Sequence, residues 1–204
     1  MRCRSLAMAA ALGLALRGTS LAADPRFPDW PCNQIKVPEL SVAAVWAGPP
    51  IDDIGNAWED DPAVRELVAR LAARRTTLDE AQTAIADAIS GASAERQRKA
   101  KLIFAGLFKT LDRERSEVMR GIERYTRKQK EFADQIRAEI LELRGLQDRP
   151  DHEQSKLDEL TSRVEWDTRI FEERRKTVGF VCEVPVQIEQ RLFTLARAIQ
   201  QALE

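Results

Sequence analysis

Histidine and cysteine are scarce in this chain of 204 residues, and this limits the chemistry open to it. The single histidine is His152, and of three cysteines only Cys32 and Cys182 lie beyond residue 22. These residues do not form a ligand cluster of the kind that zinc sites use, and neither cysteine belongs to a C-x-x-C motif. The sequence therefore predicts no metal, no other cofactor and no redox-active dithiol.

Sequence motifs of catalysis are lacking as well. There is no glycine-rich phosphate loop, no G-x-S-x-G nucleophile motif and no H-E-x-x-H. Most carboxylates alternate with basic residues, as is typical of solvent-exposed pairs on helices. His152 stands between Asp151 and Glu153 without the convergent partners that acid–base catalysis needs, so we interpret it as a surface residue. We expect a protein that is not an enzyme.

Long hydrophobic runs are missing, and an apolar, uncharged stretch at the start of the chain is too short to span a membrane. Leu6 to Leu16 spans eleven residues, whereas a membrane span needs about 20. Arg2 and Arg4 precede this stretch, and Ser20-Leu21-Ala22 follows it with small residues at the right spacing for cleavage. Residues 1–22 are therefore predicted to be a secretory signal peptide, with an uncleaved anchor as the alternative, and no later segment is expected to span a membrane.

Export changes the interpretation of charge and cysteine content. Three arginines leave with residues 1–22, so the formal net charge changes from −1 to −4. A net negative charge disfavours nonspecific binding to nucleic acid. In an oxidising compartment the two remaining cysteines favour a Cys32–Cys182 disulfide. Two free thiols, or a disulfide to another chain, are the alternatives.

Residues 23–60 concentrate the residues that interrupt regular structure. Six of the nine prolines and three of the four tryptophans fall here. This composition predicts an irregular strap laid over a helical surface, with a short helix around Leu40–Trp46. Trp30, Trp46 and Trp58 could line a ligand pocket, but packing onto the helices is the favoured interpretation.

Helix start signals are clear after the strap. Asp61 is suited to cap a helix that has Pro62 at its first position. Thr77 and Glu80 form a capping-box pattern for a second helix. Ser93 is expected to cap a third helix, which meets no proline before Pro150.

The third helix carries a coiled-coil pattern. From Phe104 to Leu146, apolar residues fill ten of thirteen heptad seam positions, and Arg115, Gln129 and Glu139 fill the others. A helix of about 53 residues would be roughly 80 Å long. Two glycines interrupt it: Gly106 is explained by close approach of a neighbouring helix, and Gly121 by close interhelical packing or by contact with a partner.

A return path is expected after a turn over Gly145–Asp151, with Pro150 starting it. The heptad count from Leu157 continues unbroken through Pro185 to Ala202. This predicts one kinked helix or two nearly coaxial helices on the same face of the third helix. Residue x would then lie opposite residue 298 − x.

The two ends of this hairpin differ in pattern. Residues 102–108 are apolar around most of the helix, which requires several covering neighbours, whereas residues 112–183 show a narrow stripe between charges. We therefore predict an all-α fold with a helical domain over residues 61–204. A four-helix base (61–111 and 184–204) would carry a long antiparallel two-helix coiled-coil arm (112–183).

Four short stretches suggest a relationship. They are PDWPC at 28–32, AGLF at 105–108, ERS at 114–116 with GIERY at 121–125, and VCEVP at 181–185. Together they resemble a family of uncharacterised secreted proteobacterial proteins. The resemblance implies a periplasmic location in a Gram-negative bacterium and no particular activity.

These observations favour a non-enzymatic periplasmic interaction or adaptor protein. The arm would engage an unidentified periplasmic protein through its tip, whose candidate contact residues are Arg144, Gln147, Asp148, Arg149, Asp151 and His152. The alternative is a helical bundle that holds a small apolar ligand under the Trp-rich strap. Pairing of the arm seams between chains would instead give a homo-oligomer.

Overall fold

The computed structural model of the chain describes residues 24–151 and 153–204, and this part is all-helical, without strands. Six helices follow one another in these ranges: α1 (Val42–Val45), α2 (Ala57–Asp60), α3 (Pro62–Ala72), α4 (Leu78–Ala88), α5 (Ser93–Gln147) and α6 (Gln154–Gln201). The all-α prediction is confirmed. The expected signal peptide and His152 lie outside the described residues.

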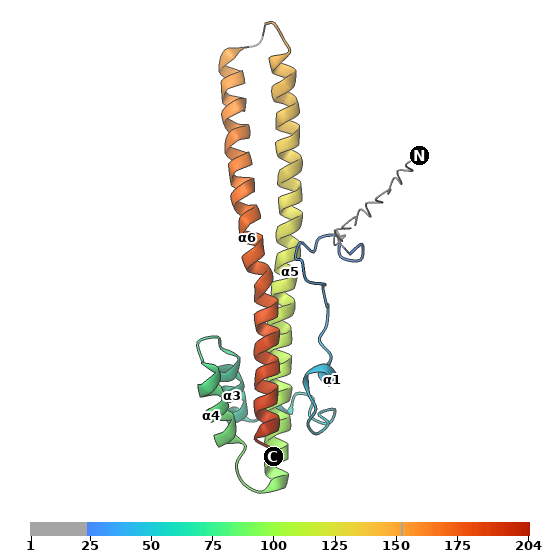
Figure 1. Ribbon diagram of the computed structural model, residues 1–204, viewed down its shortest axis with the longest axis vertical. Helices are drawn as coiled ribbons and strands as arrows, with labels where there is room; N and C mark the ends of the chain where they lie inside the picture. Colours follow the sequence, from blue (N-terminus) through green and yellow to red (C-terminus); the bar gives the residue numbers. More distant parts are fainter. Residues whose placement is uncertain (1–23, 152) are drawn as a thin grey trace, which may run out of the picture.

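Helices α5 and α6 form a long antiparallel hairpin (Figure 1). At its middle, Tyr125 Oη donates a hydrogen bond of 3.1 Å to the carbonyl oxygen of Arg174. At its lower end, Arg96 Nη2 donates to the carbonyl oxygen of Ala202 at 2.7 Å. Both pairs lie within one residue of the register that the heptad pattern predicts.

The starts of α3 and α4 follow from their capping residues. The Asp61 carboxylate accepts hydrogen bonds from the N–H groups of Ala63 and Val64, and proline occupies the first position of α3. Thr77 and Glu80 form the reciprocal capping box of α4. The N–H of Thr77 also stabilises the ionised carboxylate, so the pKa of Glu80 lies below its ordinary value. Both predicted helix starts are confirmed.

Three predicted helix boundaries are wrong. Ser93 is the first residue of α5, and the N-cap position belongs to Ala92, which makes no side-chain cap. Helix α5 runs through Gly145 to Gln147, so the predicted turn starts too early. Helix α6 begins at Gln154, beyond Pro150, with Glu153 at its N-cap position.

Pro185 lies inside a single helix, so two separate coaxial helices are excluded. Helix α6 is continuous from Gln154 to Gln201, although proline lacks the N–H that would bond to the carbonyl four residues earlier. Pro185 is buried, as are Cys182 and Ile188 on either side of it. Packing of this stretch offsets the missing hydrogen bond, which a count of helix propensity alone cannot anticipate.

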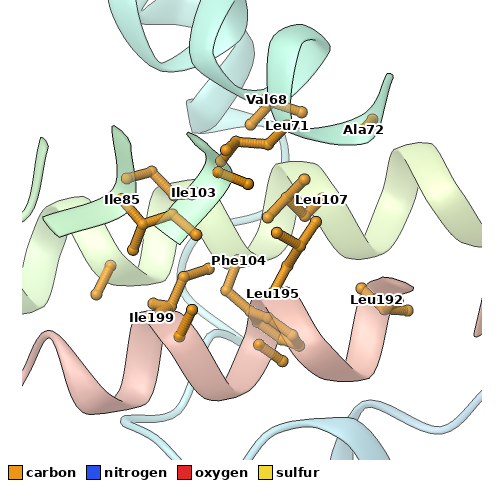
Figure 2. Close-up of a cluster of buried hydrophobic side chains, with 14 of the residues drawn as sticks. Val68, Leu71, Ala72, Ile85, Ile103, Phe104, Leu107, Leu192, Leu195 and Ile199 are labelled. Atoms are coloured by element: carbon orange, nitrogen blue, oxygen red, sulfur yellow. The ribbon is translucent and has the colours of Figure 1, made fainter. Parts of the chain in front are cut away.

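A hydrophobic core joins the short helices to the lower half of the hairpin. Figure 2 shows Val68 and Leu71 of α3 and Ile85 of α4 gathered around side chains of α5 and α6. The core residues Phe104, Leu107, Leu195 and Ile199 are each 0% exposed. Full burial of such a side chain contributes about 1.5–3 kcal/mol, so this region holds most of the hydrophobic stabilisation.

Most of the strap, including α1, runs along the hairpin on the side away from α3 and α4 (Figure 1), whereas α2 at its end contacts α3. The strap contains these two short helices and is therefore not irregular throughout. Near its lower end Trp58 packs against Gly106 of α5. A Cβ atom at Gly106 would lie 2.7 Å from Val68 Cγ2 and 2.9 Å from the Trp58 ring. The predicted close approach at Gly106 is therefore present.

Candidate functional site

Beyond the strap, towards the connecting turn, the hairpin consists of α5 and α6 alone. We call residues 131–172 the distal hairpin. Within it, Ile136 and Leu160 are the only buried residues that the structure describes. Leu141 is 65% exposed and Trp166 is 61% exposed. Two helices alone can bury only a narrow seam, so this segment supplies surface rather than core.

The seam of the distal hairpin is also partly polar. Phe132 and Phe171 meet across it with ring centroids 6.5 Å apart, and the Arg174 guanidinium lies 5.1 Å from the Phe132 centroid. One carboxylate oxygen of Glu139 accepts a hydrogen bond from Gln135, but its buried Oε2 has no partner. Such a seam holds the helices together less firmly than an apolar one.

The predicted tip residues gather at the far end of the hairpin. Arg144 and Gln147 lie in the last turn of α5, and Asp148 is its C-cap, with its N–H donating to the Arg144 carbonyl. Arg149 and Asp151 follow in the connecting turn. All five are exposed, so the structure presents them together to solvent. His152, the sixth predicted tip residue, is outside the described part.

A disulfide fastens the start of the strap to the hairpin. Cys32 and Cys182 are bonded, with their Cα atoms 5.6 Å apart and a sequence separation of 150 residues. Beside the bond, Trp30 Nε1 donates to the Gln34 carbonyl at 2.8 Å, and Gln34 Nε2 donates to the Cys182 carbonyl at 2.6 Å. The pairing favoured by the sequence therefore exists, and neighbouring hydrogen bonds fix its position.

Arg115 is a structural anchor that the sequence analysis did not identify as such. Its side chain occupies a seam position of α5 and is 2% exposed. The guanidinium pairs with Glu189 of α6 and donates to the carbonyl oxygens of Val37 and Pro38 in the strap. A charged residue at a seam position was the available signal, and its partners in α6 and the strap explain why a buried charge is there.

Charged side chains hold the upper strap. Asp29 accepts from Lys130 at 2.9 Å and from Arg127 at 3.1 Å. These hydrogen bonds, Lys130 first, hold the pKa of Asp29 below its ordinary value. Lys36 pairs with Glu123, and its ammonium lies 4.5 Å from the Phe27 ring centroid. The strap is thus attached over several turns of the hairpin.

The three strap tryptophans do not converge on one place. Trp46 is 7% exposed and stacks on Phe104 with ring centroids 4.2 Å apart. Trp58 packs at Gly106, and its buried Nε1 has no hydrogen-bond partner. Trp30 lies near Cys182. Measured along the hairpin axis at 1.5 Å per residue, the position of Cys182 is about 18 Å from that of Phe104. Packing accounts for Trp46 and Trp58.

A cleft of about 470 Å³ opens beside the disulfide, between strap and hairpin. Its walls include Pro31 and Gln34 from the strap and Phe171 and Val178 from the hairpin. It combines apolar walls with a few polar groups, as small-molecule sites do. Of the strap tryptophans, Trp30 is the one tied to this cleft, through its hydrogen bond to Gln34.

Residues 24–151 and 153–204 contain no group of three or more His, Cys, Asp or Glu side chains placed to hold a metal ion. No helix in this part of the chain combines the length and hydropathy of a membrane-crossing segment.

Comparisons of the chain with protein-family models, with curated proteins and with solved structures found no match.

Proposed function

We propose that this chain is a non-enzymatic adaptor that engages a protein partner through its hairpin. In this view the helices of residues 61–111 and 184–204 form a stable base, and residues 112–183 form a coiled-coil arm. Residues 1–22 would direct the protein to the periplasm of a Gram-negative bacterium. The strap would fix the root of the arm.

The observation that carries this proposal is the exposure of large apolar side chains on the distal hairpin. Trp166 and Leu141 are more than 60% exposed, on a segment that contributes almost nothing to the core. Tryptophan is enriched at the energetic centres of protein interfaces. Trp166 falls between the seam positions 164 and 167, so it points away from α5 rather than into the seam.

A deletion tests the role of the arm directly. Removing residues 125–172 and joining 124 to 173 through a short turn shortens both helices at matching levels and keeps Cys32 and Cys182. The variant should remain helical and disulfide-bonded but lose its partners in a quantitative pull-down from periplasm. Retention of the same partners at the same yield would contradict the proposal.

Site-specific crosslinking locates the contact. A photoreactive residue at Trp166 or Asp148 should give a discrete crosslinked product in periplasm. The same group at Arg70, an exposed position of α3, is the matched control and should give none. Equal products from all three positions would indicate nonspecific capture.

The cleft beside the disulfide favours a second candidate function, in which a small apolar ligand binds under the strap. Its 470 Å³ volume suits such a molecule. Lipid or quinone extracts should then change tryptophan fluorescence in the wild-type chain and fail to do so in a Trp30→Phe variant. Flat titrations of the wild-type chain would exclude this function.

A further inference from the structure

Gly121 has no structural role within the chain that the contacts reveal. Glycine destabilises the interior of a helix relative to alanine, and close packing explains Gly106 but not Gly121. A Cβ atom at Gly121 would meet only Arg124 Nη2, at 3.8 Å. Close packing between α5 and α6, one of the two explanations open from the sequence, is therefore wrong for Gly121.

Gly121 lies in an apolar groove of about 320 Å³ between α5 and α6. Val118 and Tyr125 line it from α5, and Thr177 and Val181 line it from α6. Phe180, next to Val181, is 79% exposed, the most exposed of the large hydrophobic side chains in the described residues. An apolar groove with an exposed phenylalanine next to one of its lining residues is a surface suited to a partner.

The same side of the hairpin is already an interface lower down. Arg191 of α6 donates to the carbonyl oxygens of Leu71 and Thr76, and Arg74 pairs with Glu114 of α5. The α3–α4 pair therefore covers this side up to Glu114. Gly121 lies two helical turns further on, about 10 Å at 1.5 Å per residue, so the groove continues an established interface past its edge.

Along the side of α5 that carries Gly121, acidic residues precede it and basic residues follow it. Glu114 and Glu117 precede Gly121, and Arg124 and Lys128 follow it. At 100° per residue all four lie within about 60° of Gly121 around the helix. Glu117, Arg124 and Lys128 are exposed, and none has an ion-pair partner among the described residues. They are available to an external partner with the reverse pattern.

A second copy of α5 running in the opposite direction has that reverse pattern. If the two copies cross at Gly121, residue x lies opposite residue 242 − x of the other copy. Glu117 then faces Arg124, and Glu114, which also pairs with Arg74 of its own copy, faces Lys128. Each facing pair occurs twice. A parallel arrangement would instead bring the α3–α4 units of both copies to the same level of the same side, where they would collide.

We propose that this groove binds a second copy of the chain, with the two α5 helices crossing antiparallel at Gly121. The groove places Gly121 level with Thr177, so Phe180 of each copy lies within about one helical turn of the crossing level, measured along the hairpin. Because α3–α4 limits the contact beyond Glu114, the interface is small, and the dimer should be weak and concentration-dependent. This self-association does not depend on the proposed role of the distal hairpin.

Charge reversal tests the pairing. In sedimentation velocity from about 5 to 500 µM, the wild-type chain should shift from monomer to dimer. Glu117→Arg or Arg124→Glu should each raise the dissociation constant by about tenfold or more, since like charges then face each other. An equimolar mixture of the two variants should recover dimerisation, because every facing pair is again of opposite sign.

Arg137→Glu is the matched control for charge. Arg137 is exposed and lies about 160° around α5 from Gly121, so its reversal should leave the dissociation constant unchanged. A wild-type chain that stays monomeric over the whole range would overturn the proposal. So would a mixture of the two variants that fails to recover the dimer.

Gly121→Leu separates folding from dimerisation. Leucine is a better helix former than glycine, and the groove leaves space for its side chain in the monomer, so the thermal midpoint of the diluted protein should not fall. The added side chain should nevertheless block the crossing and abolish the dimer. An unchanged dissociation constant in this variant would also overturn the proposal.

Discussion

The two ends of one helical hairpin behave as different kinds of structure. At the end of the hairpin near the C-terminus, Phe104 and Leu195 are 0% exposed, whereas Leu141 and Trp166 in the distal hairpin are more than 60% exposed. Both ends follow the same heptad pattern. The difference is that α3, α4 and the strap cover the proximal end, while the distal helices have only each other.

This contrast shows how a seam that is continuous in sequence can serve two purposes. Where neighbours cover the hairpin, apolar residues outside the seam are buried and stabilise the fold. Where neighbours are absent, such residues remain exposed and are available to a partner. Local opening should accordingly require least free energy at the tip and most near the core.

The largest expected effect compares a core residue with an exposed one. Phe104→Ala should lower the free energy of unfolding by about 3–5 kcal/mol, because it removes a buried ring and leaves a cavity. Leu141→Ala, the matched control, should change it by less than about 0.5 kcal/mol. Urea denaturation followed by circular dichroism measures both. Similar losses for the two variants would abolish the distinction between the two ends.

The disulfide stands at the boundary between the two regions. Replacing both Cys32 and Cys182 with serine should lower the free energy of unfolding by about 3–5 kcal/mol, since the bond closes a loop of 150 residues. Hydrogen exchange should increase first in the strap and less in the core. Faster exchange at the core alone would contradict the assigned position of the bond.

Arg115 joins hairpin and strap from inside the seam. Arg115→Ala should cost about 2–3 kcal/mol, because two strap carbonyl groups and Glu189 lose their partner in a mostly buried site. Arg115→Met keeps the volume and should cost less. Denaturation of both variants, with Arg137→Ala as an exposed control, checks this order. Equal stability of Arg115→Ala and the control would remove Arg115 from the account.

The smallest effect concerns the upper strap and pH. Since the pKa of Asp29 is lowered by Lys130 and Arg127, its contacts contribute fully above the pKa of an unfolded aspartate and are lost as pH falls through the folded value. The strap near Asp29 should therefore loosen only below about pH 4. NMR shifts of residues 27–30 report this, and Asp29→Asn should remove the transition.

Much of the fold followed from local chemistry. Asp61 and the Thr77–Glu80 box located two helix starts, and the heptad count gave the register that Tyr125 and Arg174 display. The prediction that Ser93 caps a helix is wrong because the loop geometry places Ala92, one residue earlier, at the N-cap position. Pro185 left open whether the return path is one helix or two, because burial, which a sequence does not state, outweighs the missing hydrogen bond.

The candidate surfaces were less accessible to sequence reasoning. Trp166 and Phe180 could be assigned outside the seam, since each falls between two seam positions, but their exposure depends on how far α3 and α4 extend. The roles of Arg115 and Gly121 depend on contacts with distant segments, or on their absence. The heptad pattern marks such residues as exceptions, but their explanation requires the tertiary contacts.

The most direct test of the central claim is a distance across the hairpin within one molecule. Spin labels at the exposed positions Glu131 and Arg169, diluted with excess unlabelled protein, should be roughly 15–25 Å apart, as two adjacent helix axes and the label arms require. If α5 and α6 instead continued in line or paired between chains, 38 residues of helix would place the labels about 57 Å apart. That longer distance would contradict the account.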